Sequence, residues 1–92
     1  MRINKGFICK KVLDNYILID TKHNNKSVYK LNDTSKYIYD LLLSNYTLED
    51  IINDVKVKYD IDLVKASEDV TEFMDELYKL GIINDWDTGW VI

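Results

Sequence analysis

The chain contains no proline, and its 92 residues include only three glycines, one cysteine and one histidine. The shortage of Pro and Gly leaves no visible flexible linker and little irregular loop. Because Cys9 is the only cysteine, no internal disulfide can form, and we expect a cytoplasmic location. No apolar run reaches the length of a signal peptide or a membrane span, so we expect no membrane partner.

The residues that are present fit one small globular domain. Hydrophobic residues make up 47% of the chain and charged residues 30%, a balance that argues against disorder. A chain of this size can bury one core. We therefore predict a single domain over residues 1–92, with its core at about 6–83 and a C-terminal tail at 84–92.

The charges are divided unevenly along the chain. Residues 1–32 carry seven Lys or Arg against two Asp, a net charge of +5, whereas the remainder carries five basic and fourteen acidic residues, a net charge of −9. An asymmetry of this kind bears on the choice of partners and not on the fold.

Three strands are predicted in the basic third of the chain. Residues 7–13 and 16–21 are rich in β-branched and aromatic side chains, and Asp14-Asn15 between them is a candidate two-residue turn. A polar loop at 23–26 then separates the second strand from a third at Ser27–Leu31.

Three helices are predicted after the strands, because polar N-cap residues and stop signals alternate with apolar residues at helical spacing. The caps are Asn32 or Asp33, Thr47 and Asp62, and the helices end near Ser44, Asp60-Ile61 and Leu80-Gly81. The buried stripe of the third helix is predicted at Leu63, Ala66, Val70, Phe73, Leu77 and Leu80. The order predicts an α+β fold of the winged helix-turn-helix type, a three-stranded antiparallel sheet followed by three helices (βββααα).

Side chains that could carry chemistry are scarce. His23 lies in a polar loop with no second His, Cys or carboxylate at metal-ligating spacing, and Cys9 alternates along a strand as a small hydrophobic residue does. The sequence has no phosphate-binding glycine loop, nucleophile motif or zinc spacing. We therefore expect no catalytic residue, no metal site and no cofactor, and we predict that the chain is not an enzyme.

The winged-helix order raises one alternative function, a DNA-binding transcription regulator with the third helix as its recognition helix. Residues 62–80 carry six acidic side chains against two lysines, a net charge of −4. Duplex DNA presents one phosphate charge per ~1.7 Å and would repel such a helix. We therefore expect no nucleic-acid partner. A structural adaptor without peptide specificity is a third possibility.

The third strand, Ser27–Leu31, is the candidate free edge of the sheet, because it is short and directly precedes the helices. Alternation places Tyr29 and Leu31 inward and Val28 and Lys30 on the other face. A free edge offers unpaired N–H and C=O groups to which an extended peptide can add as another strand. Lysines on such an edge equally fit a strand that is only protected against aggregation.

Five segments, taken in order, resemble the PqqD-like family, whose members recognise precursors of ribosomally synthesised and post-translationally modified peptides (RiPPs). They are Gly6-Phe7, Leu31-Asn32-x-Thr34, Tyr39-x-Leu41-Leu42, Thr47-Leu48-Glu49-Asp50-Ile51, and Asp69-Val70-x-x-Phe73-x-x-x-Leu77-x-x-x-Gly81-Ile82-Ile83. Each segment alone is weak, but their order and spacing over residues 6–83 are fairly specific. The chain departs from the pattern at Leu63, where many relatives begin the third helix with Pro, and in the tail that contains Trp86 and Trp90.

The resemblance implies a free-standing winged-helix-like protein that binds the leader segment of a precursor peptide as an added strand. It places the cleft between the third strand and the third helix. It also implies delivery of the precursor to a modifying enzyme, such as a radical SAM maturase or a leader peptidase, without catalysis by the chain itself.

Carried onto this chain, the resemblance gives two walls of a cleft. The strand wall comprises Ser27, Val28, Tyr29, Lys30 and Leu31. For the helix wall we predict Thr71, Met74, Asp75 and Tyr78, with the opposite flank of Glu72, Glu76 and Lys79 as the competing choice. Met74 fits core packing equally well. Lys30 on one wall and carboxylates on the other predict a mixed-charge leader with one or two apolar anchors.

Overall fold

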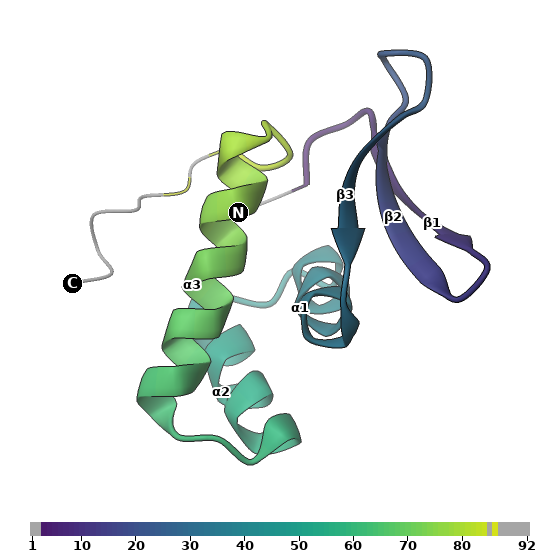
Figure 1. Ribbon diagram of the computed structural model, residues 1–92. Coiled ribbons are helices and arrows are strands. Elements are labelled where there is room, and N and C mark those ends of the chain that lie inside the picture. The colour runs from purple at the N-terminus through teal and green to yellow at the C-terminus, as the bar shows by residue number, and fades with distance from the viewer. Residues whose placement is uncertain (1–2, 85, 87–92) are drawn as a thin grey trace.

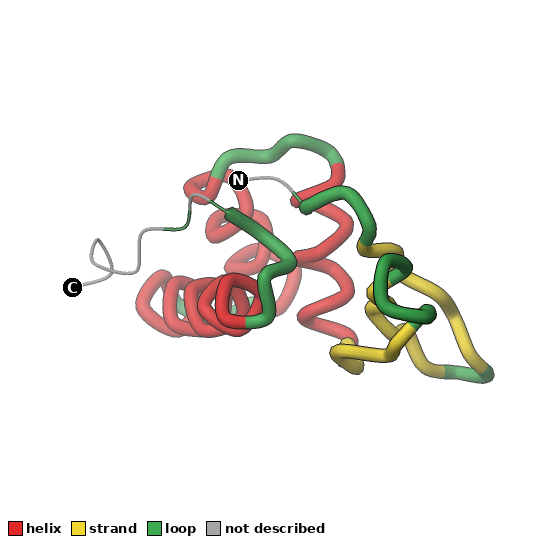
Figure 2. Tube along the Cα trace, turned by 90° about the horizontal axis from the view of Figure 1, so that it is seen from above, coloured by secondary structure: helices red, strands yellow, loops and turns green. Residues whose placement is uncertain are grey.

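The computed structural model describes residues 3–84 and 86, and it confirms the predicted order of three antiparallel strands followed by three helices. The elements are β1 (Phe7–Val12), β2 (Asn15–Asp20), β3 (Lys26–Leu31), α1 (Asp33–Leu43), α2 (Leu48–Tyr59) and α3 (Leu63–Lys79). The sheet has the order β1-β2-β3, so β1 and β3 are its edges. The helices gather on one side and the strands on the other (Figures 1 and 2).

The turn between β1 and β2 lies one residue earlier than predicted. Val12 pairs with Asn15, so the two turn residues are Leu13 and Asp14. Asn15 was predicted as a turn residue, but here it begins β2. Leu13 instead takes a φ of 57°, and its side chain is 87% exposed. A Cβ in that region crowds the following carbonyl, so this turn is strained.

A register shift in β3 alters the simple alternation predicted for this strand. Leu18 pairs with Tyr29 and Ile19 with Ser27, which leaves Val28 as an extra residue opposite β2. Val28 and Tyr29 both pack partly against the core, although alternation had placed them on opposite faces. Leu31 is buried, as predicted.

The strand-to-helix step at Asn32 contains no separate loop. The N–H of Ser35 donates to Oδ1 of Asn32, and the N–H of Asn32 donates to Oγ of Ser35, each over 2.8 Å. This reciprocal capping box satisfies two N–H groups that a helix start would otherwise leave unpaired. It also connects the start of α1 to the end of β3 through a single residue. The predicted caps Thr47 and Asp62 are confirmed for α2 and α3.

All three helices end on a residue with left-handed backbone. These residues are Asn45, Asp60 and Gly81, with φ values of 62°, 51° and 74°. After α3, the N–H of Ile82 donates to the carbonyl of Leu77 over 2.9 Å, which closes a Schellman motif. Asn and Asp visit this region more readily than most residues with a side chain. The chain can therefore stop two helices without glycine, which explains how it folds with so few.

The buried face of α3 differs from the predicted stripe at both ends. Leu63 and Leu80 are 53% and 40% exposed, because they lie at the two ends of the helix, beyond its packed surface. Met74 is fully buried instead, in the same core cluster as Phe73 and Val70. The face that α3 turns to the core is therefore centred on its middle turns.

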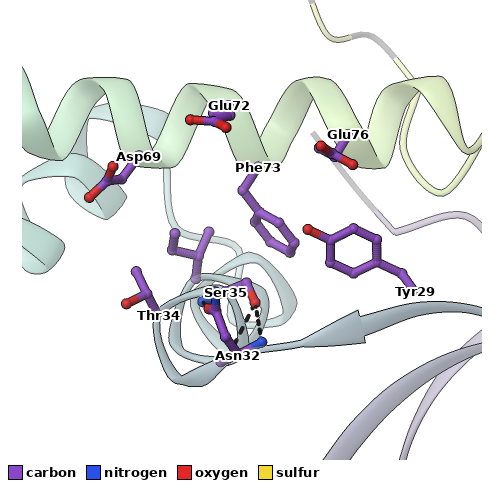
Figure 3. A pocket seen from close by; sticks show the side chains of 9 residues that line it. Tyr29, Asn32, Thr34, Ser35, Asp69, Glu72, Phe73 and Glu76 are labelled. Carbon is purple, nitrogen blue, oxygen red and sulfur yellow. Dashed lines mark hydrogen bonds between the residues drawn. The ribbon is translucent and has the colours of Figure 1, made fainter.

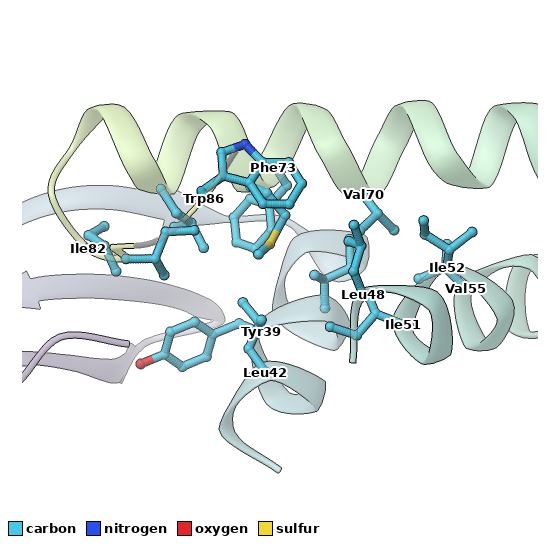
Figure 4. Packing of buried hydrophobic residues seen from close by; sticks show 14 of the residues in the cluster. Tyr39, Leu42, Leu48, Ile51, Ile52, Val55, Val70, Phe73, Ile82 and Trp86 are labelled. Atoms are coloured by element: carbon cyan, nitrogen blue, oxygen red, sulfur yellow. The ribbon is translucent and has the colours of Figure 1, made fainter. Parts of the chain in front are cut away.

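The two ends of the described chain attach to α3 and to the segment that directly follows it. Ile3 forms a β-bridge with Ile83, and the N–H of Asn4 donates to the carbonyl of Ile82 over 2.7 Å. Trp86 is buried in the core cluster, and its indole N–H donates to the carboxylate of Asp75 (Figure 4). Trp90 lies outside the described residues. Among the helices described, none is long and apolar enough to cross a bilayer.

The strain at Leu13 gives a stability prediction. Leu13→Asn should raise the free energy of unfolding by about 0.5–1 kcal/mol, because Asn tolerates left-handed backbone and the Leu side chain is exposed. Chemical denaturation monitored by circular dichroism measures the change. Leu13→Ala is the control. It removes the exposed apolar side chain, but Ala does not tolerate left-handed backbone as Asn does. Equal gains in both variants would contradict the role of backbone strain.

Candidate functional site

A groove of about 260 Å³ lies where the end of β3, the start of α1 and one face of α3 meet (Figure 3). Its lining residues are Tyr29 from β3, Asn32, Thr34, Ser35 and Ile38 from the start of α1, and Asp69, Glu72, Phe73 and Glu76 from α3. The β3 edge that borders the groove has no neighbouring strand in the described sheet and faces α3 (Figure 1). The groove is thus open to an extended chain on one side.

The floor of the groove is aromatic and apolar. The rings of Tyr29 and Phe73 lie with their centroids 5.9 Å apart and their planes tilted by 51° (Figure 3). Phe73 and Ile38 are 5% and 1% exposed, so the core holds both side chains in place. Because these residues are already packed, an apolar side chain entering the groove would meet a preformed surface.

The α3 side of the groove is acidic. Asp69, Glu72 and Glu76 line it, and none of its lining residues is Lys, Arg or His. Asp69 forms an ion pair with Lys65 over 3.0 Å. Within the described residues, neither Glu72 nor Glu76 forms an ion pair or a side-chain hydrogen bond. Among the residues that the structure describes, these two carboxylates therefore line the groove without a direct ion pair, and the charge of Glu72 acts on Lys65 only at longer range.

The carboxylates of Glu72 and Glu76 change the titration of Tyr29 in the floor of the groove. The pKa of the Tyr29 phenol is raised above its ordinary value, first by burial and then by the negative charges of Glu76 and Glu72. A nearby negative charge disfavours the phenolate, so this shift reflects the same acidic wall.

The structure brings together only part of the predicted site. Of the strand residues Ser27 to Leu31, Tyr29 lines the groove, Leu31 is buried in the core without lining it, and Lys30 is exposed outside it. Of the predicted helix residues, Thr71 and Met74 are buried, Asp75 accepts the hydrogen bond from Trp86, and Tyr78 is exposed outside the groove. The competing flank contributes Glu72 and Glu76, but not Lys79.

Several groove residues were not predicted as site residues. Asn32, Thr34, Ser35 and Ile38 come from the first two turns of α1, and Asp69 and Phe73 from α3. Phe73 was assigned to the core, which is correct, but one side of its ring also forms the floor. The capping sequence directly after Leu31 could have predicted the α1 residues of the groove. A helix that starts where a strand ends has its first turns next to the end of that strand.

A second hollow on the other flank of α1 is larger, about 440 Å³, and more open. Its lining comprises Tyr16, Asp33, Lys36, Tyr37, Asp40, Lys58 and Tyr59. Its charges balance, and its lysines are engaged: Lys36 pairs with Asp40 over 2.6 Å, and Lys58 lies over the Tyr37 ring at 5.0 Å. It borders no free strand edge, so we place the candidate site in the first groove.

No cluster of three or more His, Cys, Asp or Glu side chains that could hold a metal ion occurs within residues 3–84 and 86. His23, expected to lack a partner, has one: its Nδ1 lies 2.6 Å from a carboxylate oxygen of Asp20 in an exposed turn. Cys9 is half-buried, and burial raises the pKa of its thiol, which disfavours the reactive thiolate.

The acidic wall predicts how Tyr29 titrates. Replacing Glu72 and Glu76 together by Gln should lower the Tyr29 pKa, because two charges that oppose the phenolate are removed. The pKa should stay above its ordinary value, since burial remains. The Tyr29 ¹³Cζ chemical shift, followed over about pH 8 to 12, measures it. Glu49→Gln, an exposed change on α2, is the control. An unchanged Tyr29 titration in the double variant would place the carboxylates away from the ring.

Two proteins of known structure share this fold. The chain is 17% identical to the protein in "TbiB1 in Complex with the TbiA(beta) Leader Peptide", with a TM-score of 0.82 over 95% of this chain and 99% of that one. It is 20% identical to the protein in "Lasso peptide synthetase B1 complexed with the leader peptide", with a TM-score of 0.77 over 88% and 93%. No curated protein gave a significant sequence match. The sequence model of the family described as Coenzyme PQQ synthesis protein D (PqqD) matches residues 15–83, and the chain therefore belongs to the PqqD family.

Proposed function

We propose that this chain binds the leader segment of a RiPP precursor as an additional strand along the free edge of β3. The observation that carries this function is the groove between that edge and α3, with its preformed aromatic floor. Membership of the PqqD family supports it, as does a fold shared with two proteins whose structures contain leader peptides.

Strand addition divides the work of recognition between backbone and side chains. The unpaired N–H and C=O groups of β3 would supply main-chain hydrogen bonds that do not depend on sequence. The floor of Tyr29, Phe73 and Ile38 would accept an apolar side chain and supply selectivity. The extra residue at Val28 interrupts the regular register, so the bound segment would pair mainly with residues 29–31.

The chain would present the leader to a separate modifying enzyme and would not itself catalyse the modification. The maturation chemistry would come from that partner, such as a radical SAM maturase or a leader peptidase, in the cytoplasm. The alternative, a DNA-binding regulator, is not favoured. Asp69, Glu72 and Glu76 give α3 an acidic face, and a recognition helix with such a face would be repelled by DNA phosphates.

A titration of labelled leader peptides tests the proposal. Leaders from precursor genes beside the gene for this chain should bind saturably, with dissociation constants below roughly 100 μM, or about −5.5 kcal/mol. Backbone N-methylation of successive peptide residues should weaken binding with a period of two, because alternate N–H groups of an added strand face β3. Saturable binding without that period would contradict strand addition, and no saturable binding by any leader would contradict the function.

Amide chemical shifts locate the bound segment. Titration should shift the signals of Tyr29, Glu72 and Phe73 and leave Lys10 on the opposite edge strand unchanged. Shifts confined to β1, or to the hollow beside Tyr37, would show that the peptide binds outside the proposed groove. A 20-bp DNA duplex is the control ligand, because its phosphates should be repelled by α3.

A further inference from the structure

The charged side chains that line the groove indicate which charges its ligand should carry. The sequence predicted a mixed-charge leader, with Lys30 on one wall and carboxylates on the other. In the structure Lys30 does not line the groove, and every charged side chain that does is acidic. Asp69 forms an ion pair with Lys65, whereas neither Glu72 nor Glu76 forms an ion pair within the described residues. Both carboxylates are therefore available to pair with positive charges on a ligand.

The spacing of these two carboxylates matches the repeat of an extended peptide. Along a helix with a rise of 1.5 Å per residue, positions 72 and 76 are about 6 Å apart. Same-face side chains of a strand, at i and i+2, are about 6.7 Å apart. In Figure 3, the axes of β3 and α3 lie roughly parallel across the groove, with the two chains running in opposite directions, so a strand added to β3 would follow the row of carboxylates.

The floor suits long basic side chains as well as purely apolar ones. The rings of Tyr29 and Phe73 lie between β3 and the carboxylates of α3 (Figure 3). A Lys or Arg that reaches from the added strand to α3 would lay its methylene groups over these rings and place its charged head beside a carboxylate. Arg has the further advantage of a planar group that pairs with a carboxylate through two hydrogen bonds.

We propose that the groove selects segments with Lys or Arg at two positions separated by one residue, i and i+2, and that Glu76 and Glu72 are the residues that select them. This charge rule rests on the proposed peptide-binding function and specifies its substrate class. It makes Glu72 and Glu76 specificity residues, and it assigns the floor a second role as the surface for the stems of the basic side chains.

Selection from a display library of random 12-residue linear peptides tests the charge rule without knowledge of the natural leader. Peptides enriched on the wild-type chain should carry Lys or Arg at i and i+2. Their affinities, measured by fluorescence polarisation, should fall at least ~10-fold when both residues are changed to Met, which keeps the stem and removes the charge. The same loss should follow from the protein variant Glu72→Gln with Glu76→Gln.

Three comparisons separate this rule from a general effect of charge. Combining the peptide and protein changes should cost little more than either alone, because both remove the same contact. The control Glu49→Gln removes an equally negative charge from α2 and should leave affinity unchanged. The charge-reversed protein, with Lys at 72 and 76, should enrich peptides with Asp or Glu at i and i+2, provided that its thermal unfolding remains cooperative.

The outcomes distinguish failure of this rule from failure of the proposed function. Peptides that bind saturably but are not enriched in Lys or Arg would overturn the charge rule and leave peptide recognition intact. Peptides that bind the Gln variant as tightly as the wild-type chain would do the same. The absence of any saturable binder would overturn both.

Discussion

The rotation of α3 about its own axis is the constraint on which the rest of the structure depends. Ala66, Val70, Met74 and Leu77 are all fully buried, and they lie on one face of the helix at a spacing of three or four residues. A turn by one residue, about 100°, would expose this face and bury carboxylates in its place. Packing therefore holds Glu72 and Glu76 on the side that faces β3, and the character of the groove follows from the core.

The second wall depends on the step from β3 into α1. Leu31 is anchored in the core, and the next residue, Asn32, already caps the helix through its exchange of hydrogen bonds with Ser35. No loop residues intervene, so the strand edge, the first turns of α1 and the face of α3 are held at fixed positions. A groove held in this way loses little conformational entropy when a ligand binds, which favours recognition of a flexible peptide.

The uneven distribution of charge along the chain corresponds to the division between sheet and helices. The basic first third forms the sheet and the acidic remainder forms the helices, so opposite charges lie on the two sides of the molecule seen in Figure 2. The groove lies at the boundary but draws its charged side chains only from the acidic side. The two similar structures share the arrangement of strands and helices at only 17% and 20% identity.

The sequence by itself determined the order of the elements, the caps at Thr47 and Asp62, the start of α1 at Asn32 or Asp33, and the left-handed stop at Gly81, because these features depend on contacts between near neighbours. It left the rotation of α3 open, since Met74 and Phe73 are adjacent and either flank could have been turned outward. It also missed the extra residue at Val28 and the turn position of Leu13. Only the tertiary structure decided these points, because they depend on how the strands pair and how the helices pack against one another.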